Sequence, residues 1–169
     1  MIKEKGFIRK LEIKIRIADA NVGFENDILK TIGLGSCVAV MLYDRTKRIG
    51  GLLHFMLPKY LKNKKLLNEF KYCDTGMEKL IERMNAVGTK PYRMEARIVG
   101  GANMFDNFIT DKKQSIGYRN IEASKKYLQK MKIPIVADDT GGNYSRSVEF
   151  ILKTGIVKVS SYRKGELIL

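Results

Sequence analysis

Two short apolar runs joined by a charged turn are the feature that most limits how this chain can fold. The first run, Val38–Tyr43, reads VAVMLY, and the second, Ile49–Leu57, reads IGGLLHFML. A run as short and as nearly apolar as the first is typical of a strand buried on both faces, and the second also reads as a strand. Arg45–Arg48 form the turn, so we predict that the two runs pair as a hairpin.

This hairpin would bring together two residues with chemical potential. The chain has two cysteines and one histidine; Cys37 directly precedes the first run and His54 lies late in the second. In an antiparallel pair the start of one strand lies beside the end of the other. We therefore expect Cys37 and His54 to face each other although they are far apart in the sequence.

The residues around Cys37 favour nucleophilic catalysis. Only a thiolate attacks a carbonyl carbon, so a catalytic cysteine needs a nearby base, and His54 carries the only imidazole. Backbone N–H groups of the tight turn Gly35-Ser36-Cys37 can stabilise the oxygen that becomes negative. The hydroxyl of Thr31 can accept the second N–H of the ring. We predict Cys37, His54 and Thr31 as catalytic residues and Gly35 and Ser36 as substrate-binding residues.

Inert packing of both residues stays open as an alternative. A cysteine in an apolar run is more often a small buried hydrophobe, and a lone histidine is more often part of a core. Cys73 has no glycine turn before it and is predicted to be structural. The sequence predicts no metal site, because it has one histidine and no cysteine pair at metal-ligand spacing.

Three common motifs are tested and rejected. Gly33-Leu-Gly-Ser-Cys-Val38 begins like a dinucleotide fingerprint, but Val38 replaces the third glycine and a strand follows instead of a helix. Val38 also replaces the second glycine of a nucleophile elbow. No P-loop pattern occurs. Dinucleotide binding, α/β-hydrolase chemistry and P-loop phosphate binding are therefore not predicted.

Period-two alternation and turn residues predict the other strands. Apolar and charged residues alternate over 8–17, which indicates a half-buried strand, and a polar loop is expected over 18–27. Thr31-Ile32 ends a short strand. The remaining predicted strands are Met94–Val99, Ile133–Ala137, and a closing hairpin of Val148–Leu152 with Ile156–Ser160.

Two helices are predicted from apolar spacing and end signals. The first begins with a capping-box pattern at Thr75-Gly-Met-Glu78 and ends before Gly88. The second follows Asn120 as its N-cap and ends before Pro134. Gly100-Gly101 is read as a plain turn. About seven strands, mostly in hairpins, favour an α+β class with helices on one side of the sheet, and residues 1–169 are expected to form one domain.

The charge favours anionic partners. Lysine and arginine exceed aspartate and glutamate by enough to give a net charge of +14. Nucleic acid, acidic protein surfaces and lipid headgroups all fit this field, and a solvated lysine surface is an equal alternative. The N-terminus lacks the apolar core of a secretion signal, and no apolar run is long enough to span a membrane. We expect a soluble, cytoplasmic protein whose thiols stay reduced.

A series of motifs resembles the CheD family of chemoreceptor glutamine deamidases, in unbroken order over roughly Ile13 to Ser160. The motifs are Thr31-x-Gly-Leu-Gly-Ser-Cys-Val-Ala-Val40, Gly51-x-x-His54, Leu57-Pro58, Lys71-Tyr-x-Asp-Thr75, Gly100-Gly-Ala-Asn-Met-Phe105, Ile116-Gly-x-Arg-Asn120, Asp139-Thr-Gly-Gly-Asn143 and Arg146-Ser-Val148.

The resemblance implies a fold and an activity. The expected fold has helices layered on two β-sheets, an α-β-β sandwich similar to that of deamidating bacterial toxins. The expected reaction converts selected glutamines of methyl-accepting chemoreceptors to glutamate through a cysteine thioester. Cys37, His54 and Thr31 match the family's nucleophile, base and assisting threonine. No cofactor is implied, and a CheC-type phosphatase is the implied regulatory partner.

Two other readings compete with the enzyme. A non-catalytic binding module could keep this fold and regulate a CheC-type phosphatase. Nucleic-acid binding ranks last, because the chain has no tryptophan and its tyrosines and phenylalanines are dispersed. The thiol chemistry alone does not separate side-chain amide hydrolysis from peptide cleavage, and only the resemblance does so.

Overall fold

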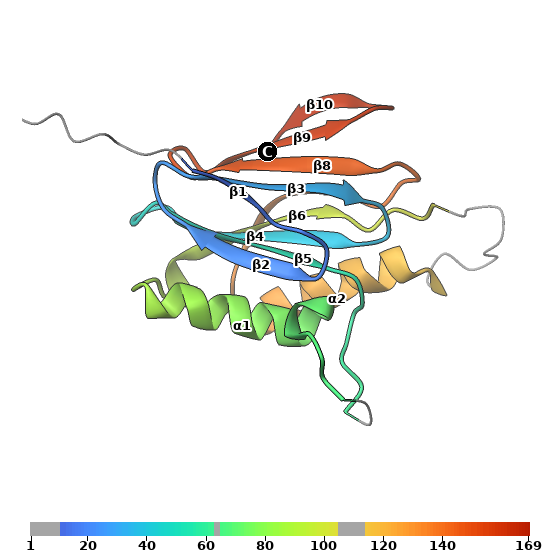
Figure 1. Cartoon of the computed structure of the whole chain (residues 1–169), viewed down its shortest axis with the longest axis horizontal. Coiled ribbons are helices and arrows are strands. Elements are labelled where there is room, and N and C mark those ends of the chain that lie inside the picture. The colour runs from blue at the N-terminus through green and yellow to red at the C-terminus, as the bar shows by residue number, and fades with distance from the viewer. Residues whose placement is uncertain (1–10, 63–64, 105–113) are drawn as a thin grey trace, which may run out of the picture.

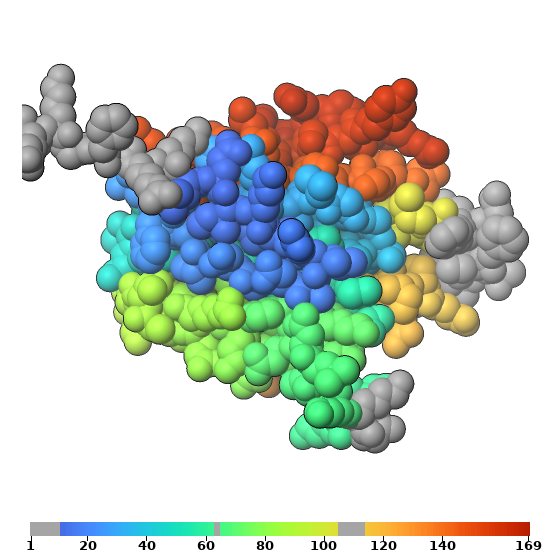
Figure 2. Space-filling model, viewed as in Figure 1, coloured from blue at the N-terminus to red at the C-terminus, as the bar shows by residue number. Residues whose placement is uncertain are grey.

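The chain folds as two helices on one face of two stacked β-sheets (Figure 1). The computed structural model describes residues 11–62, 65–104 and 114–169. The helices α1 (Cys73–Ala86) and α2 (Ile116–Lys130) cover one face of an inner sheet, and an outer sheet covers the other face. Figure 2 shows the same order on the surface, with green α1 below the blue and cyan strands and red atoms above. The predicted α+β class and its α-β-β layering are confirmed.

Each sheet has five strands among the described residues. The inner sheet has the order β2 (Asp19–Gly23), β5 (Ile49–Phe55), β4 (Val38–Asp44), β6 (Met94–Gly100), β7 (Ile135–Thr140). The outer sheet has the order β1 (Glu12–Lys14), β3 (Ile28–Leu34), β8 (Arg146–Ile151), β9 (Ile156–Ser161), β10 (Gly165–Ile168). The β4–β5 and β8–β9 pairs are antiparallel, which confirms both predicted hairpins.

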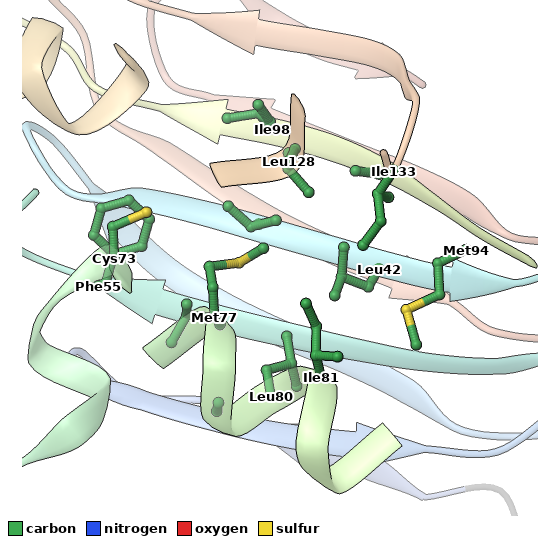
Figure 3. Packing of buried hydrophobic residues seen from close by; sticks show 14 of the residues in the cluster. Leu42, Phe55, Cys73, Met77, Leu80, Ile81, Met94, Ile98, Leu128 and Ile133 are labelled. Carbon is green, nitrogen blue, oxygen red and sulfur yellow. The ribbon is translucent and has the colours of Figure 1, made fainter. Parts of the chain in front are cut away.

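The β4–β5 hairpin is buried on both faces because it lies in the middle layer. All residues of both strands are buried. Val38, Val40 and Leu42 face the helices, whereas Ala39 and Met41 face the outer sheet. Side chains of α1 and α2 complete the first core (Figure 3). Full burial of a large aliphatic side chain contributes roughly 1.5–3 kcal/mol, so this layer supplies much of the driving force for folding.

Two glycines let the neighbouring layers approach β5 closely. A Cβ atom at Gly50 would lie 2.4 Å from Leu152, which directly follows β8 of the outer sheet, and one at Gly51 would lie 2.7 Å from Leu80 of α1. Both distances are too short for a real carbon contact, so larger residues would push the layers apart. The glycines therefore set the spacing at the strand that carries His54.

The N-terminal strand prediction was partly wrong. Within the described part of 8–17, only β1 is a strand, and 8–10 lie outside the described residues. The expected polar loop over 18–27 contains β2, which pairs with β5. The chain reverses at Ala18, whose φ is 55°, and a carboxylate oxygen of Asp19 accepts the N–H of Ala20. The polar segment is therefore a strand because it pairs with the buried strand β5.

Both predicted helix starts were wrong. The first helix begins at Cys73, and Thr75 is not a cap, because its hydroxyl donates to the Glu69 carbonyl. The second helix begins at Ile116, where Ser115 accepts the N–H of Tyr118. Asn120 is therefore not an N-cap but a buried residue inside α2.

The C-terminal strands extend beyond the prediction. The strand expected at 133–137 is shifted to β7, and β10 was not predicted. Every residue of β10 is exposed, so it lacks the half-buried alternation that identifies a strand in a sequence. None of the described helices combines the length and the apolar character needed to cross a bilayer.

Candidate functional site

The predicted base and its assisting threonine are hydrogen-bonded across the two sheets. His54 belongs to β5 of the inner sheet and Thr31 to β3 of the outer sheet. Thr31 Oγ1 lies 2.8 Å from His54 Nδ1, and the two residues are only 2% and 1% exposed. The imidazole is thus held between the sheets by a buried hydroxyl.

Cys37 lies at the same end of the hairpin and on the same face. It immediately precedes β4 and packs against the core between the sheets, as does Ala39, which is directly opposite His54. Cys37 is therefore a diagonal neighbour of His54, a relation in which Cα atoms are roughly 7–8 Å apart in antiparallel sheets. Unlike the imidazole, Cys37 is partly exposed.

Hydrogen bonds orient the peptide groups of the Cys37 turn. The Ala102 N–H donates to the Gly35 carbonyl at 2.8 Å, and the Asn120 side-chain amide donates to the Ser36 carbonyl at 2.9 Å. In a trans peptide the carbonyl and the following N–H point in opposite directions, and the described chain has no cis peptide. The N–H groups of Ser36 and Cys37 therefore point away from these partners, where they can receive an oxyanion.

Gly100 permits the close approach that these bonds require. Its φ is 112°, and a Cβ atom there would lie 2.4 Å from the Cys37 carbonyl oxygen. That carbonyl accepts the Gly101 N–H at 2.8 Å. The interpretation of Gly100-Gly101 as a plain turn was therefore incomplete, since the glycines bring the end of β6 against the backbone of Cys37.

Burial keeps the Cys37 thiol and the His54 imidazole neutral at neutral pH. Desolvation lowers the pKa of His54 from 6.5 to about 4, against an opposing effect of Asp19, which lies directly opposite on β2. Burial also raises the pKa of the Cys37 thiol, and its own backbone N–H partly offsets this. The pair thus consists of a thiol and a neutral imidazole, not a thiolate and an imidazolium.

The second ring nitrogen of His54 is available as a base. His54 Nε2 is buried and has no hydrogen-bond partner among the described residues, Cys37 included. If Thr31 accepts the proton on Nδ1, the lone pair of Nε2 is free to accept a proton. Catalytic hydrogen bonds are often long or poorly aligned before substrate binds, so the missing contact does not exclude His54 as the base.

Cys73 has a different environment. It is 1% exposed and lies in the core between α1 and the inner sheet, near Phe55 and Met77 (Figure 3). Burial raises the pKa of its thiol to about 12. Cys73 therefore carries neither the exposure nor the acidity of a nucleophile.

Alkylation should separate the two cysteines. Iodoacetamide should modify Cys37 well before Cys73, because only Cys37 is accessible and has the less perturbed thiol. Peptide mass spectrometry after timed quenching measures both rates in one sample. The Cys73→Ala variant should leave the Cys37 rate unchanged. Equal rates in the folded protein would contradict the assignment.

Titration of the single histidine should show an unusually low pKa. Because the chain has one histidine, the imidazole signals in an NMR titration report His54 alone. We expect a midpoint near pH 4 in the folded protein and near 6.5 when it is unfolded. The unfolded state then binds the extra proton, so the free energy of unfolding should fall as the pH drops from about 6.5 to about 4. Asp19→Asn should lower the midpoint further; a folded-state midpoint near 6.5 would refute the desolvated site.

Asn120 is the site residue that sequence reasoning missed. Its side-chain amide reaches Ser36 and Met56, which lie 84 and 64 positions away in the sequence. A polar residue before a helical segment looks like a cap, and nothing nearby in the sequence indicates such distant acceptors. Only its place in the motif Ile116-Gly-x-Arg-Asn120 sets it apart.

A cavity of about 330 Å³ adjoins the Cys37 turn on the side of α2. It is lined by Gly101, Asn103, Ser115, Tyr118, Ile121, Gly141, Gly142 and Asn143. Gly101 joins it to the site, because its N–H bonds to the Cys37 carbonyl. Over the described ranges, no group of three or more His, Cys, Asp or Glu side chains could hold a metal ion.

Comparisons with known proteins agree on one family. The family model described as CheD chemotactic sensory transduction matches residues 56–161. A protein of Caldanaerobacter subterraneus subsp. tengcongensis named "Probable chemoreceptor glutamine deamidase CheD" is 44% identical over 153 residues, 90% of this chain and 94% of that protein. A protein of Pyrococcus horikoshii with the same name is 41% identical over 93% of this chain and 96% of its own length. "Chemoreceptor glutamine deamidase CheD" of Halalkalibacterium halodurans is 40% identical over 91% of this chain and 96% of its own length. With a matched region of this extent and relatives aligned over about nine tenths of its length, the chain belongs to the CheD family.

Proposed function

We propose that this protein deamidates glutamine side chains of chemoreceptors, with Cys37 as nucleophile, His54 as base and Thr31 as the residue that orients the base. The observation that carries the proposal is a partly exposed thiol beside a buried, Thr31-bonded imidazole. The substrate class comes from the relatives, whose names describe chemoreceptor glutamine deamidases.

The reaction has two halves. As the Cys37 sulfur attacks the carboxamide carbon, His54 Nε2 takes the thiol proton, and the N–H groups of Ser36 and Cys37 stabilise the oxyanion. The imidazolium then gives this proton to the leaving nitrogen, and ammonia departs to leave a thioester. In the second half His54 deprotonates a water that attacks the thioester carbon. Glutamate is released and the thiol is restored.

The neutral resting pair determines when the proton moves. Because burial raises the thiol pKa and lowers the imidazole pKa, a stable thiolate does not form before substrate arrives. Proton transfer therefore accompanies attack on the amide, as in general base catalysis. Thr31 keeps the Nδ1 proton in place and so leaves Nε2 as the acceptor.

The basic surface suits an acidic helical substrate. A hollow of about 620 Å³ lies between α2 and the segment after β5, and four of its side chains are cations against two carboxylates. Its charged residues are Lys59, Arg119, Lys126, Lys130, Asp74 and Glu122. Together with the net charge of +14, this favours docking of glutamate-rich receptor helices, and salt should weaken the encounter.

We further propose a cytoplasmic location and competition between receptor and a CheC-type phosphatase.

The second candidate is a binding module that regulates a CheC-type phosphatase without catalysis. One observation favours it: His54 Nε2 forms no hydrogen bond with the Cys37 sulfur. In this reading Cys37 and His54 are both present, but they are not close enough for the imidazole to activate the thiol. The two candidates differ in whether receptor glutamines change.

Mass spectrometry of receptor fragments tests the proposal. Purified cytoplasmic receptor fragments are incubated with wild-type protein, with Cys37→Ala and with Cys73→Ala. The enzyme reading requires the mass change from amide to acid with wild type and Cys73→Ala, and its loss with Cys37→Ala. If no fragment changes while wild type and Cys37→Ala bind a CheC-type phosphatase equally, the binding module is the correct function.

A further inference from the structure

Asn120 joins the two strand ends that carry the proposed nucleophile and base. The last pair of the β4–β5 ladder is Val38 opposite Phe55, and the strands part beyond it. At this point Asn120 Nδ2 donates to the Ser36 carbonyl at 2.9 Å and to the Met56 carbonyl at 2.8 Å. One amide thus bridges the residue before Cys37 and the residue two positions after His54.

The helix that carries Asn120 is fixed against the same segment. A Cβ atom at Gly117 would lie 2.4 Å from the Gly101 carbonyl oxygen, so α2 is in backbone contact with the end of β6. This contact places the next turn of α2 over the strand ends. Asn120 is fully buried, and its position is set by the helix and not by a flexible loop.

Packing alone does not explain an asparagine here. Its Oδ1 is buried and has no hydrogen-bond partner among the described residues. An unpaired buried acceptor is unfavourable, and an apolar side chain of similar volume would avoid it. What the asparagine supplies is its pair of N–H donors, both directed at the backbone of the site.

We propose that Asn120 is a positioning residue for the deamidation reaction, holding the Cys37 turn at a fixed distance from the His54 strand and aiming the Cys37 N–H at the reacting oxygen. The inference rests on the proposed function. By fixing the Ser36 carbonyl, the amide fixes the opposite end of that peptide group, which is the Cys37 N–H. Without the bridge, two carbonyl oxygens would face each other with no donor between them, and the strand ends would separate.

Steady-state kinetics on Asn120 variants test this. Asn120→Ala removes the bridge, and Asn120→Asp keeps the volume but offers at most one donor. Misplacement of catalytic groups by about 1 Å costs on the order of 10²-fold in rate. We therefore expect kcat on receptor fragments to fall about 10²-fold in Asn120→Ala and less in Asn120→Asp, with KM nearly unchanged, because no substrate contact is removed.

Ser124→Ala is the matched control. Ser124 is also buried, lies one turn along α2, and donates to the backbone carbonyl of Asn120. Loss of this hydroxyl leaves both Asn120 bonds to Ser36 and Met56 in place, so kcat should stay within about twofold of wild type. A kcat loss in Ser124→Ala as large as in Asn120→Ala, or a change in KM alone, would overturn the inference.

Cys37 alkylation gives a readout that does not depend on deamidation. Each protein is first checked for folding by circular dichroism, and the iodoacetamide rate of Cys37 is then measured. The rate should differ from wild type in both Asn120 variants, because the Cys37 turn is no longer held against the His54 strand, and should stay at the wild-type value in Ser124→Ala. If wild type does not deamidate receptor fragments but these alkylation rates differ as stated, the proposed function fails, and Asn120 is still shown to position the Cys37 turn. If wild type is active and neither kcat nor alkylation changes in Asn120→Asp, the positioning role fails.

Discussion

Replacing His54 with asparagine should lower the deamidation rate by about 10²- to 10⁴-fold, the range that a positioned general acid–base group contributes. Asparagine is chosen because its amide can keep a hydrogen bond to Thr31 in place of Nδ1, while nothing replaces Nε2. The variant therefore removes the proton acceptor with little change in the packing between the sheets. Ammonia release from a receptor fragment measures the rate, and thermal unfolding checks the fold.

Thr31 variants provide the control for this result. Thr31→Ser keeps the hydroxyl and should retain most of the activity, whereas Thr31→Val keeps the shape and removes the hydroxyl that holds Nδ1. Thr31→Val should therefore lose activity, but less than His54→Asn, because the imidazole remains. An active His54→Asn protein, within about tenfold of wild type, would exclude His54 as the base.

Replacing Arg146 with alanine should lower the free energy of unfolding by about 3–5 kcal/mol, the usual cost of removing one partner of a buried ion pair. Arg146 of β8 is 2% exposed, and its guanidinium bonds to both carboxylate oxygens of Asp139 at 2.8 and 3.0 Å. It also donates to the Gly141 carbonyl and stacks 4.0 Å from the ring centroid of Tyr144. The alanine variant leaves the Asp139 carboxylate partly buried without its counter-charge.

Urea unfolding followed by circular dichroism measures this effect. Arg146→Lys should recover only part of the loss, because a lysine cannot bond to both oxygens of a carboxylate in the same plane. In the double variant Arg146→Ala with Asp139→Asn the cost should be smaller than the sum of the single costs, since no charge is then left unpaired. A loss below about 1 kcal/mol in Arg146→Ala would show that water already compensates Asp139.

The centre of the fold is readable from the sequence because its residues carry strong local signals. Val38–Tyr43 and Ile49–Leu57 are short, apolar and separated by a charged turn, and their hairpin appears as predicted. The C-terminal hairpin follows from the same logic, with alternating burial along β8 and β9. In both cases the pattern arises from contacts between neighbours in sequence, so a local reading suffices.

Two strands at the edges of the sheets could not be predicted in this way. The edge strands β2 and β10 lack a clear apolar period, because β2 buries only Ala20 and Gly23 and β10 is exposed throughout, so pairing with a partner strand defines them. The predicted helix starts were wrong because more than one residue near each start has the chemistry of a cap. The helix α1 begins before Thr75 without a side-chain cap, and α2 begins before Asn120, with Ser115 as its cap.

The candidate site also has a part that could be predicted from the sequence and a part that could not. Cys37 and His54 come together through one hairpin, so their proximity could be inferred from the sequence. The hydroxyl of Thr31 was expected to serve the ring, but that it does so from the other sheet is visible only in the structure. Asn120 acts across more than sixty positions through backbone carbonyls, which leave no trace in residue type.

In the proposed mechanism, the hydrogen bond between Thr31 and His54 makes catalytic competence depend on the spacing of two layers, since neither sheet alone contains both partners. A slight parting of the sandwich would free the imidazole to rotate and exchange its tautomer while each strand ladder remained intact. Mild heat or denaturant would then abolish turnover before the secondary structure unfolds. Turnover would therefore report the packing of the two sheets more sensitively than a spectroscopic measurement of strand or helix content.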